Sequence, residues 1–300
     1  MSGSAVLPQV TPGSVSPEAG RQAAADAASA AAAAGVRIEL ADDIPQLQTV
    51  AQFFAEVWQT PQGQPPLPSD VLRTIVHAGG MVHVARAGGD LAGAAVMIFC
   101  PPGSRGVYSA IAAARRSDRG VGFALKQAQR ACALEHGTTS MMWTFDPLIS
   151  RNARFNLVKL GAVALDYAVN FYGPLNDGID GQGDTDRLVA AWSLAGPRAA
   201  SAAQGRYCDV TGPDLSTVRV DPAPAPDGGP LTARDQDGRW CRVPPDILAV
   251  RRGDPPLADR WRSALRDALL PALAEGLAAT GFSRDGWYRL TPRTDAEDYR

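Results

Sequence analysis

The sequence predicts a mixed α/β fold in which helices pack on a layer of strands. Two kinds of apolar pattern, and the order in which they follow one another, predict it. Residues 107–112 and 141–145 have the short apolar pattern of strands, and residues 121–136 between them have the spacing of an amphipathic helix that ends at Gly137. This strand–helix–strand unit indicates a layered α/β domain.

The elements before this unit follow from alternation and from helix-start signals. Residues 36–40 alternate as a strand, and Asp42 or Asp43 caps a helix that carries Phe53 and Phe54 on its apolar face. A short helix at 71–77 follows a proline-rich stretch. Strands at 81–86 and 91–99 are joined by two glycines and an aspartate, which is typical of a hairpin.

The elements after the unit continue the same layer. A helix at 150–160 ends at Gly161, and strands are expected at 163–171 and 188–194. Further on, residues 240–243 resume a strand, and Asp254 begins a leucine-rich helix that Pro271 should kink or split. An Asp-Gly turn within residues 282–290 predicts a last hairpin.

Composition divides the chain into four parts. Residues 1–34 are poor in large apolar side chains and are expected to form a disordered tail. Residues 35–195 form the core, residues 196–235 a Pro/Gly-rich linker or loop, and residues 236–300 a helix–hairpin segment that packs on the core. That segment completes the sheet of its own chain or, as a swapped element, that of a second copy in a homodimer.

Charge and cysteine content exclude several classes of protein. The 300 residues carry 29 basic and 31 acidic side chains, a net charge of −2, so no basic field favours nucleic acid. The longest apolar run, 91–100, is shorter than the roughly 20 residues of a membrane helix. Four scattered cysteines and three histidines have no metal-ligand spacing. We expect a cytoplasmic protein without nucleic-acid, membrane or metal partners.

A strand–loop–helix junction is the first candidate site. The strand at 107–112 enters a loop with Arg115, Arg116 and Arg119, and a helix begins among Gly120 and Gly122. Amides at a helix start are unpaired and carry partial positive charge, and glycines allow an anion to approach them. The junction therefore predicts a phosphate site, although a glycine pair is also ordinary loop sequence.

The end of the next strand is the second candidate. Asp146 stands there before a proline, and Asn152 and Asn156 are four residues apart on the following helix. Polar groups where strands leave a sheet are typical ligand contacts. The alternative is that Asp146 caps the helix and the asparagines face water.

At these two sites the chain resembles the GNAT N-acyltransferase superfamily. The junction is similar to its coenzyme A motif, (Q/R)-x-x-G-x-(G/A). Residues 143–148 and 152–162 resemble the W-T-F-D-P-L and N-A-x-F-N-x-x-K-L-G-A signature of a predicted-acetyltransferase branch. Residues 170–173 and 185–187 are similar to its N-x-Y-G and S-D-R motifs. The resemblance covers residues 36–195 and extends to the tail from Val243.

The resemblance implies a splayed central sheet that holds acyl-coenzyme A, with no metal. The backbone of Ile111 and Ala112 would hold the pantetheine, and the amides of 117–122 the pyrophosphate. Ser117 replaces the motif's usual Gln or Arg. The implied cofactor-binding residues are Ile111, Ala112, Arg116, Ser117, Asp118, Arg119, Gly120, Val121 and Gly122.

The implied reaction is direct attack of a primary amine on the thioester. Asp146 is the expected base or ammonium anchor and Tyr172 the expected proton donor, because Leu157 occupies the position of the family's common tyrosine. The expected acceptor is a small molecule such as an amino acid, and the acyl group is acetyl or, as the alternative, succinyl. The implied substrate-binding residues are Trp143, Asn152, Asn156, Asn170 and Arg187. The competing hypothesis is a GNAT-fold module that binds coenzyme A thioesters or a protein without turnover.

Overall fold

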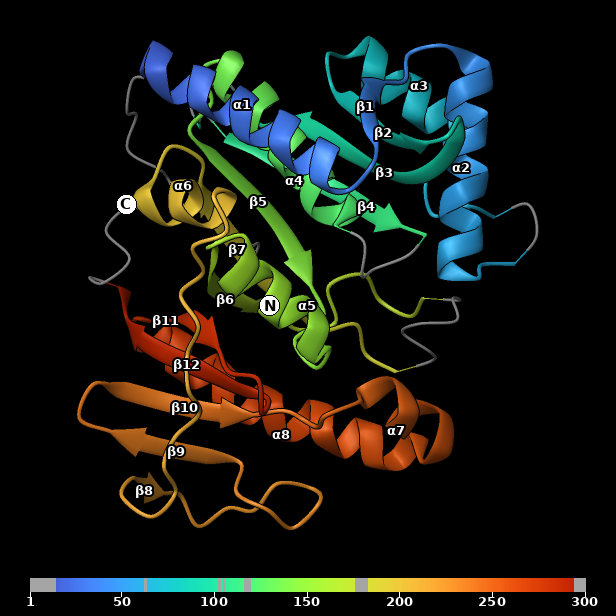
Figure 1. Cartoon of the computed structure of the whole chain (residues 1–300). Helices are drawn as coiled ribbons and strands as arrows, with labels where there is room; N and C mark the ends of the chain where they lie inside the picture. The colour runs from blue at the N-terminus through green and yellow to red at the C-terminus, as the bar shows by residue number, and fades with distance from the viewer. Residues whose placement is uncertain are drawn as a thin grey trace.

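One mixed sheet organises the whole molecule (Figure 1). The computed structural model describes residues 15–61, 64–101, 104, 106–115, 120–175 and 183–293. Its 12 strands follow the spatial order β1-β2-β3-β4-β5-β7-β6-β11-β12-β10-β9-β8. The predicted class, a mixed sheet flanked by helices with a C-terminal helix–hairpin segment, is confirmed.

The first half of the sheet contains the predicted strand–helix–strand unit. Its strands are β1 (Arg37–Leu40), β2 (Met81–Ala87), β3 (Asp90–Phe99), β4 (Gly106–Ala114) and β5 (Ser140–Phe145). Its helices are α1 (Pro17–Ala33), α2 (Ile44–Trp58), α3 (Ser69–His77) and α4 (Val121–Glu135). Asp43 caps α2 through the amide of Gln46, as its position before the helix predicts.

The second half carries the C-terminal segment. Its strands are β6 (Val163–Ala168), β7 (Arg187–Ser193), β8 (Arg219–Val220), β9 (Thr232–Asp235), β10 (Gly238–Arg242), β11 (Leu277–Phe282) and β12 (Trp287–Pro292). Its helices are α5 (Ser150–Arg154), the π-helical η3 (Phe155–Lys159), α6 (Pro197–Ala203), α7 (Ile247–Gly253) and α8 (Pro255–Ala274).

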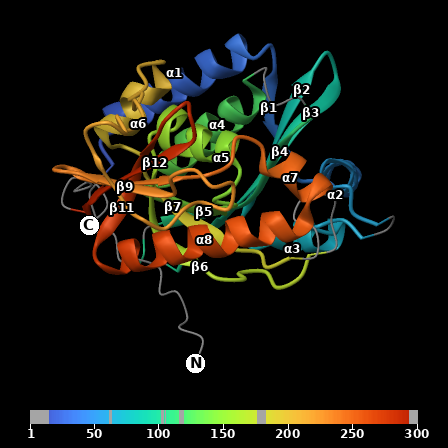
Figure 2. The ribbon, with the colours of Figure 1, turned by 90° about the horizontal axis from the view of Figure 1, so that it is seen from below.

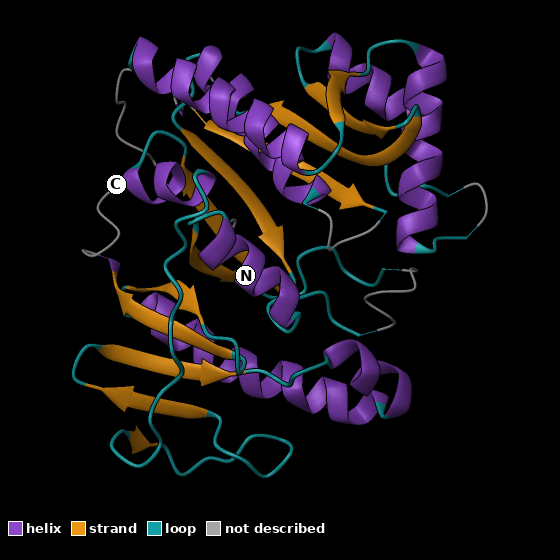
Figure 3. Cartoon of the chain, viewed as in Figure 1, coloured by secondary structure: helices purple, strands orange, loops and turns teal. Residues whose placement is uncertain are grey.

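Helices cover both faces of the sheet. Figure 2 shows α1 and α4 on one face and α8 on the other, and Figure 3 shows the strands between these helical layers. Strand alternation produces this arrangement. Ala85 and Ala95 pack with Val121 and Leu125 of α4, whereas their neighbour Val84 belongs to the cluster of α2 and α3 on the opposite face.

The prediction of a disordered tail over residues 1–34 is wrong where the structure describes it. α1 begins at the cap of Ser16, and its Ala23 is fully buried. Asp26 forms an ion pair of 2.9 Å with Arg130 of α4, and both side chains are buried. Small alanines let the two helices approach closely, so α1 docks without the large apolar stripe that the prediction required.

The prediction of a linker over residues 196–235 is also wrong in part. This stretch forms α6, β8 and β9, and it buries Ala225 and Leu231. The C-terminal segment joins the sheet of its own chain, where β11 pairs with β6. Pro271 lies inside α8 without ending it, because packing of the fully buried Leu265 and Leu269 holds the helix on the sheet.

Candidate functional site

The central strands β4 and β5 separate after a short parallel pairing. Gly106, Val107 and Tyr108 pair with Ser140, Met141 and Met142. Beyond this point β4 pairs with β3 and β5 pairs with β7. We call the divergence of residues 109–114 of β4 from residues 143–145 of β5 the fork, which Figure 1 shows as two separating strands.

A β-bulge explains the divergence. The β3–β4 register changes between Met97, which faces Ser109, and Val96, which faces Ile111, so Ala110 is an extra residue in β4. A bulge bends its strand and increases its twist. The bend therefore lies at the first residues of the fork, and the backbone beyond it turns an unpaired edge toward β5.

Five of the expected cofactor-binding residues lie around this edge. Ile111 and Ala112 pair with β3 on one side and have no partner in β5 on the other. Gly120 caps α4 at φ 78° with no side-chain hydrogen bond, so the amides of Val121 and Gly122 begin an open helix end. Arg116, Ser117, Asp118 and Arg119 lie outside the described residues.

The fork has one face toward α4, which we call its α4 face. Trp143 of β5 is buried there and donates its indole N–H to Oδ1 of Asn156 over 3.2 Å. The Lys126 ammonium lies 3.8 Å from the centre of the Trp143 ring. Lys126 also donates to Oγ of Ser109 over 2.9 Å. Ser109 and Trp143 are the first residues of the two strands beyond the last pair, so these contacts mark the base of the fork.

A short polar chain continues from the lysine. Ser109 donates to Oε1 of Gln129 over 3.0 Å. The Gln129 Nε2 group is buried and has no hydrogen-bond partner among the described residues. Burial lowers the pKa of Lys126 to about 7. The α4 face therefore contains an amine that changes protonation near neutral pH.

The opposite side, which we call the far face, gathers hydroxyls and one guanidinium. Thr144 and Tyr172 have their oxygens 3.2 Å apart, and the Arg187 guanidinium lies 5.2 Å from the centre of the Tyr172 ring. The Tyr108 hydroxyl interacts with both of those oxygens, and burial raises its pKa to about 12. Tyr108 therefore stays protonated at neutral pH. Tyr172 is 46% exposed, so this face is accessible from solvent.

The Asp146 carboxylate does not face the fork as a free group. Arg251 of α7 donates to its Oδ2 over 2.5 Å, and the amide of Leu148 donates to Oδ1 over 2.8 Å. The Asp146 side chain is buried, and 11% of the Arg251 side chain is exposed. The pair holds α7 against the end of β5, and a role for Asp146 as base or ammonium anchor stays a prediction.

The Asn170 side chain stabilises its own turn. The residue has φ 47°, and its Oδ1 accepts from the amide of Thr185 over 3.1 Å. That Asn170 binds substrate stays a prediction. Asn152 of α5 is partly exposed, and Asn156 is occupied by Trp143.

The neighbouring Asp186 is a structural anchor. Burial alone raises the pKa of a carboxyl, but hydrogen bonds from Arg266, from the amide of Asn170 and from Tyr167 outweigh it and lower the pKa of Asp186. Arg266 of α8 donates to both of its oxygens over 2.8 Å. The β6–β7 connection is thereby fixed to α8, and this anchor positions Arg187 beside Tyr172.

Leu157 offers no proton donor, as the sequence indicates. It lies on the π-helical turn η3, and only 1% of its surface is exposed. π-helical turns are rare and are frequent at functional sites. Here the turn brings Asn156 within hydrogen-bond distance of the Trp143 indole, and the Leu157 side chain packs in the apolar core.

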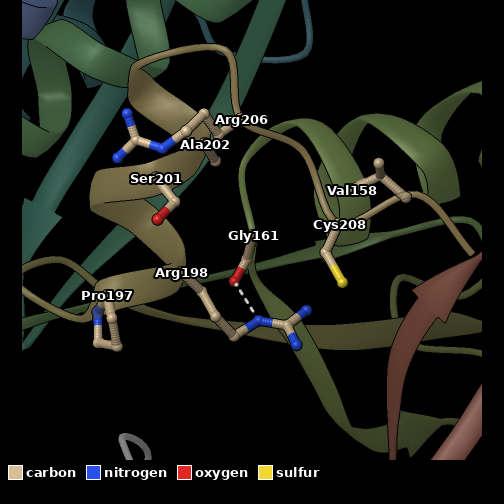
Figure 4. Close-up of a pocket in the computed structure, with 8 residues that line it drawn as sticks. All are labelled: Val158, Gly161, Pro197, Arg198, Ser201, Ala202, Arg206 and Cys208. Atoms are coloured by element: carbon tan, nitrogen blue, oxygen red, sulfur yellow. Dashed lines mark hydrogen bonds between the residues drawn. The ribbon is translucent and has the colours of Figure 1, made fainter.

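A separate pocket of about 250 Å³ lies between η3 and α6 (Figure 4). Arg198, Arg206 and Cys208 line it, and Arg198 donates to the carbonyl of Gly161. None of its lining residues belongs to either face of the fork.

The described ranges contain no group of three or more His, Cys, Asp or Glu residues that could hold a metal ion. Nor do they contain a helix long and apolar enough to cross a membrane.

Sequence reasoning missed Tyr108, Ser109, Lys126, Gln129 and Thr144. Alternation along β4 and β5 could have assigned the two strand hydroxyls to opposite faces. Lys126 had its own signal, because it is one of only two lysines in the chain and stands beside the apolar stripe of a predicted helix.

The fold and the fork define a mixed α/β protein with a splayed parallel pair at its centre. No family model and no curated protein matches this chain. An IAA acetyltransferase from Bacillus cereus ATCC 14579 is 16% identical with a TM-score of 0.40, over 52% of this chain and 98% of that chain. The yncA structure from Salmonella typhimurium, described with its cofactor acetyl-CoA, is 15% identical with a TM-score of 0.44, over 53% and 94%.

A third similar structure is the ribosomal-protein-S18-alanine N-acetyltransferase from Escherichia coli. It is 14% identical with a TM-score of 0.40, over 53% of this chain and 94% of that chain. Similarity at this level transfers neither an activity nor a substrate, so both have to be argued from the residues of this chain.

Proposed function

We propose that this protein is a GNAT-type acyltransferase that transfers an acyl group from coenzyme A to a primary amine of a small molecule. One observation carries the proposal, which is the separation of β4 from β5 next to the open start of α4. An unpaired strand edge offers amides and carbonyls to the peptide-like pantetheine arm. The helix start offers amides to the pyrophosphate.

The residues present fit such a ligand. The backbone edge of Ile111 and Ala112 has no strand partner toward the fork. At Gly122 an added Cβ would meet only the Phe155 ring edge, at 4.0 Å, so the first turn of α4 is open to an approaching group. Arg116 and Arg119, outside the described residues, remain proposed phosphate contacts.

The two faces of the fork suit two different substrates. The helix start lies on the α4 face, so the thioester arrives from that side and its carbonyl reaches the strand amides. The far face then takes the acceptor, where Tyr108, Thr144 and Tyr172 supply hydroxyls. Arg187 would attract a carboxylate, which favours an amino acid as the acceptor. The contact of Tyr172 with Thr144 supports a position for Tyr172 on the acceptor side.

Release of free thiol tests this proposal. The purified chain is incubated with acetyl- or succinyl-coenzyme A and a panel of amino acids and simple amines. The proposal predicts thiol release that depends on one donor and on amines, and a rate that falls with Tyr172→Phe. The exposed Tyr207→Phe is the matched control, because Tyr207 lies beside Lys159 and away from the fork.

Two other results have distinct meanings. Tight binding of a thioester without thiol release over the whole panel would favour a non-catalytic binding module. Failure to bind any coenzyme A species would contradict both readings of the fork.

A further inference from the structure

Lys126 occupies an unusual position for a lysine. Its side chain is buried at the base of the fork, with Ser109 of β4 on one side and Trp143 of β5 on the other. Within the described part of the chain, no carboxylate lies within ion-pair distance of it. A buried ammonium without a counter-ion is costly, so a purely structural role would favour another residue.

The other buried cations among the residues that the structure describes are arginines with oxygen partners. Arg130 pairs with Asp26, and Arg262 donates to the carbonyl of Asp184. The chain has only two lysines among its 29 basic residues, and the second, Lys159, is exposed. Arginine stays protonated in proteins, whereas a buried lysine exchanges its proton. Within the described residues no carboxylate pairs with the buried Lys126, and a lysine at such a position points to proton exchange.

The surroundings of Lys126 leave its ammonium form and its neutral amine form close in free energy at neutral pH. Desolvation lowers the pKa of Lys126, while the Trp143 ring stabilises the ammonium. Arg130, one turn further along α4, is paired with Asp26. His83 of β2 stands on the same face of the sheet, and burial lowers its pKa to about 4, so it is neutral at pH 7. Ser109, Gln129 and Trp143 carry no charge.

We propose that Lys126 is the proton donor to the sulfur of coenzyme A during acyl transfer. This inference rests on the proposed function, because it places the thioester on the α4 face of the fork. The amine nitrogen bonds to the carbonyl carbon, and the carbon–sulfur bond breaks with its electron pair left on sulfur. Lys126 passes one proton to that sulfur. The proton lost by the attacking nitrogen restores the ammonium through solvent.

The position of Lys126 suits proton donation to the sulfur better than the positions of Leu157, Asp146 and Tyr172 do. Leu157 is apolar, Asp146 is held by Arg251, and the Tyr172 hydroxyl lies on the far face with Thr144. Lys126 shares the α4 face with the start of α4, five residues before it in the chain. Of these groups it alone joins the two diverging strands at the base of the fork.

The test reads the thiol of bound coenzyme A and needs no acceptor. Thiolate absorbs ultraviolet light where the thiol does not, so a pH titration of bound free coenzyme A gives the thiol pKa, with bound acetyl-coenzyme A as the blank. An ammonium within contact distance lowers the pKa of an acid by about 1–3 units. We expect that lowering in the unaltered protein, and we expect Lys126→Met to abolish it while coenzyme A still binds.

Three more variants separate charge from proton transfer. Lys126→Arg keeps a cation, so it should retain a lowered thiol pKa and still lose acyl transfer, because arginine does not give up its proton. The expected loss for both Lys126 variants is about 10²–10⁴-fold in kcat. Lys159→Met is the matched lysine control and should change neither quantity. Tyr172→Phe should leave the thiol pKa unchanged.

The outcomes are distinguishable. An unshifted thiol pKa in the unaltered protein, or a shift that persists in Lys126→Met, overturns the inference, and a shift lost only in Tyr172→Phe assigns the donor to that tyrosine. Absence of coenzyme A binding contradicts the proposed function itself. If Lys126→Met does not fold, calorimetry of the unaltered protein replaces it as the test. Binding is measured in buffers of different ionisation enthalpy, which reveals protons released on binding. Free coenzyme A should release a proton when it binds, and acetyl-coenzyme A should not.

Discussion

At the scale of single residues, variants of Asp146 distinguish a structural role of this carboxylate from a role in the reaction. Its ion pair with Arg251 is largely shielded from solvent, because 8% of the Asp146 side chain and 11% of the Arg251 side chain are exposed. Removing one partner of such a pair leaves an uncompensated charge and costs about 3–5 kcal/mol. We therefore expect Asp146→Asn to lower the free energy of unfolding by about that amount, as measured by urea denaturation.

The double variant Asp146→Asn/Arg251→Met decides between the two roles. If the pair only holds α7 to β5, removing both charges should recover most of the stability and the thiol-release activity. A double variant with normal stability and no activity would instead show that Asp146 acts as the base of the reaction.

The residues of the candidate site were predictable to different degrees. Asp146, Trp143 and Asn156 are near the fork because they follow a strand end that the apolar pattern locates. Their partners were not predictable, since Arg251 is 105 positions away and reaches Asp146 only through the C-terminal segment. Lys126 was overlooked because charged residues on a helix are normally solvated, and only the sheet and α1 together bury this helix.

At the scale of elements, α1 makes α4 a buried helix. Arg130 is sandwiched between Asp26 of α1 and the carbonyl of Leu194, to which it donates over 2.7 Å. We predict that Asp26→Ala costs about 3–5 kcal/mol of unfolding free energy, because the Arg130 charge loses its buried partner. Thermal and urea unfolding measure it.

Two comparisons check that explanation. Asp26→Ala/Arg130→Met should be more stable than Asp26→Ala alone, and Glu18→Ala, at an exposed position of the same helix, should be nearly neutral. Equal losses for Asp26→Ala and Glu18→Ala would show that the ion pair does not hold α1.

The predicted and observed elements differ where packing between segments distant in the sequence determines the secondary structure. The strand–helix–strand unit was predicted to within two residues at each end, because its apolar periodicities are strong. α1 was not, since an alanine-rich helix lacks an apolar stripe and its helical state depends on docking to α4. Leu277, the first residue of β11, continues the leucine spacing of α8 across Gly276, which has φ 92°, so the apolar pattern alone does not separate this strand from the helix.

At the scale of the molecule, the sheet links the proposed coenzyme A side to the C-terminal segment. β5 carries the fork on one edge and pairs with β7 on the other, and β6 and β11 continue the sheet to β8. α7 and α8 then return to the fork through Arg251 and Arg266, which bind Asp146 and Asp186. The C-terminal segment is thus part of the scaffold of the site, which the sequence predicted only as a segment packed on the core.

Calorimetric binding of acetyl-coenzyme A to the whole chain tests the central claim most directly, with Gly122→Trp and Glu135→Trp as the paired variants. Both substitutions lie on α4, but Glu135 is exposed at the opposite end, about 20 Å from Gly122. The fork predicts saturable binding that Gly122→Trp abolishes and Glu135→Trp preserves. Binding of acetyl-coenzyme A that persists in Gly122→Trp, or no binding to the unaltered protein, would contradict the claim that the fork holds coenzyme A.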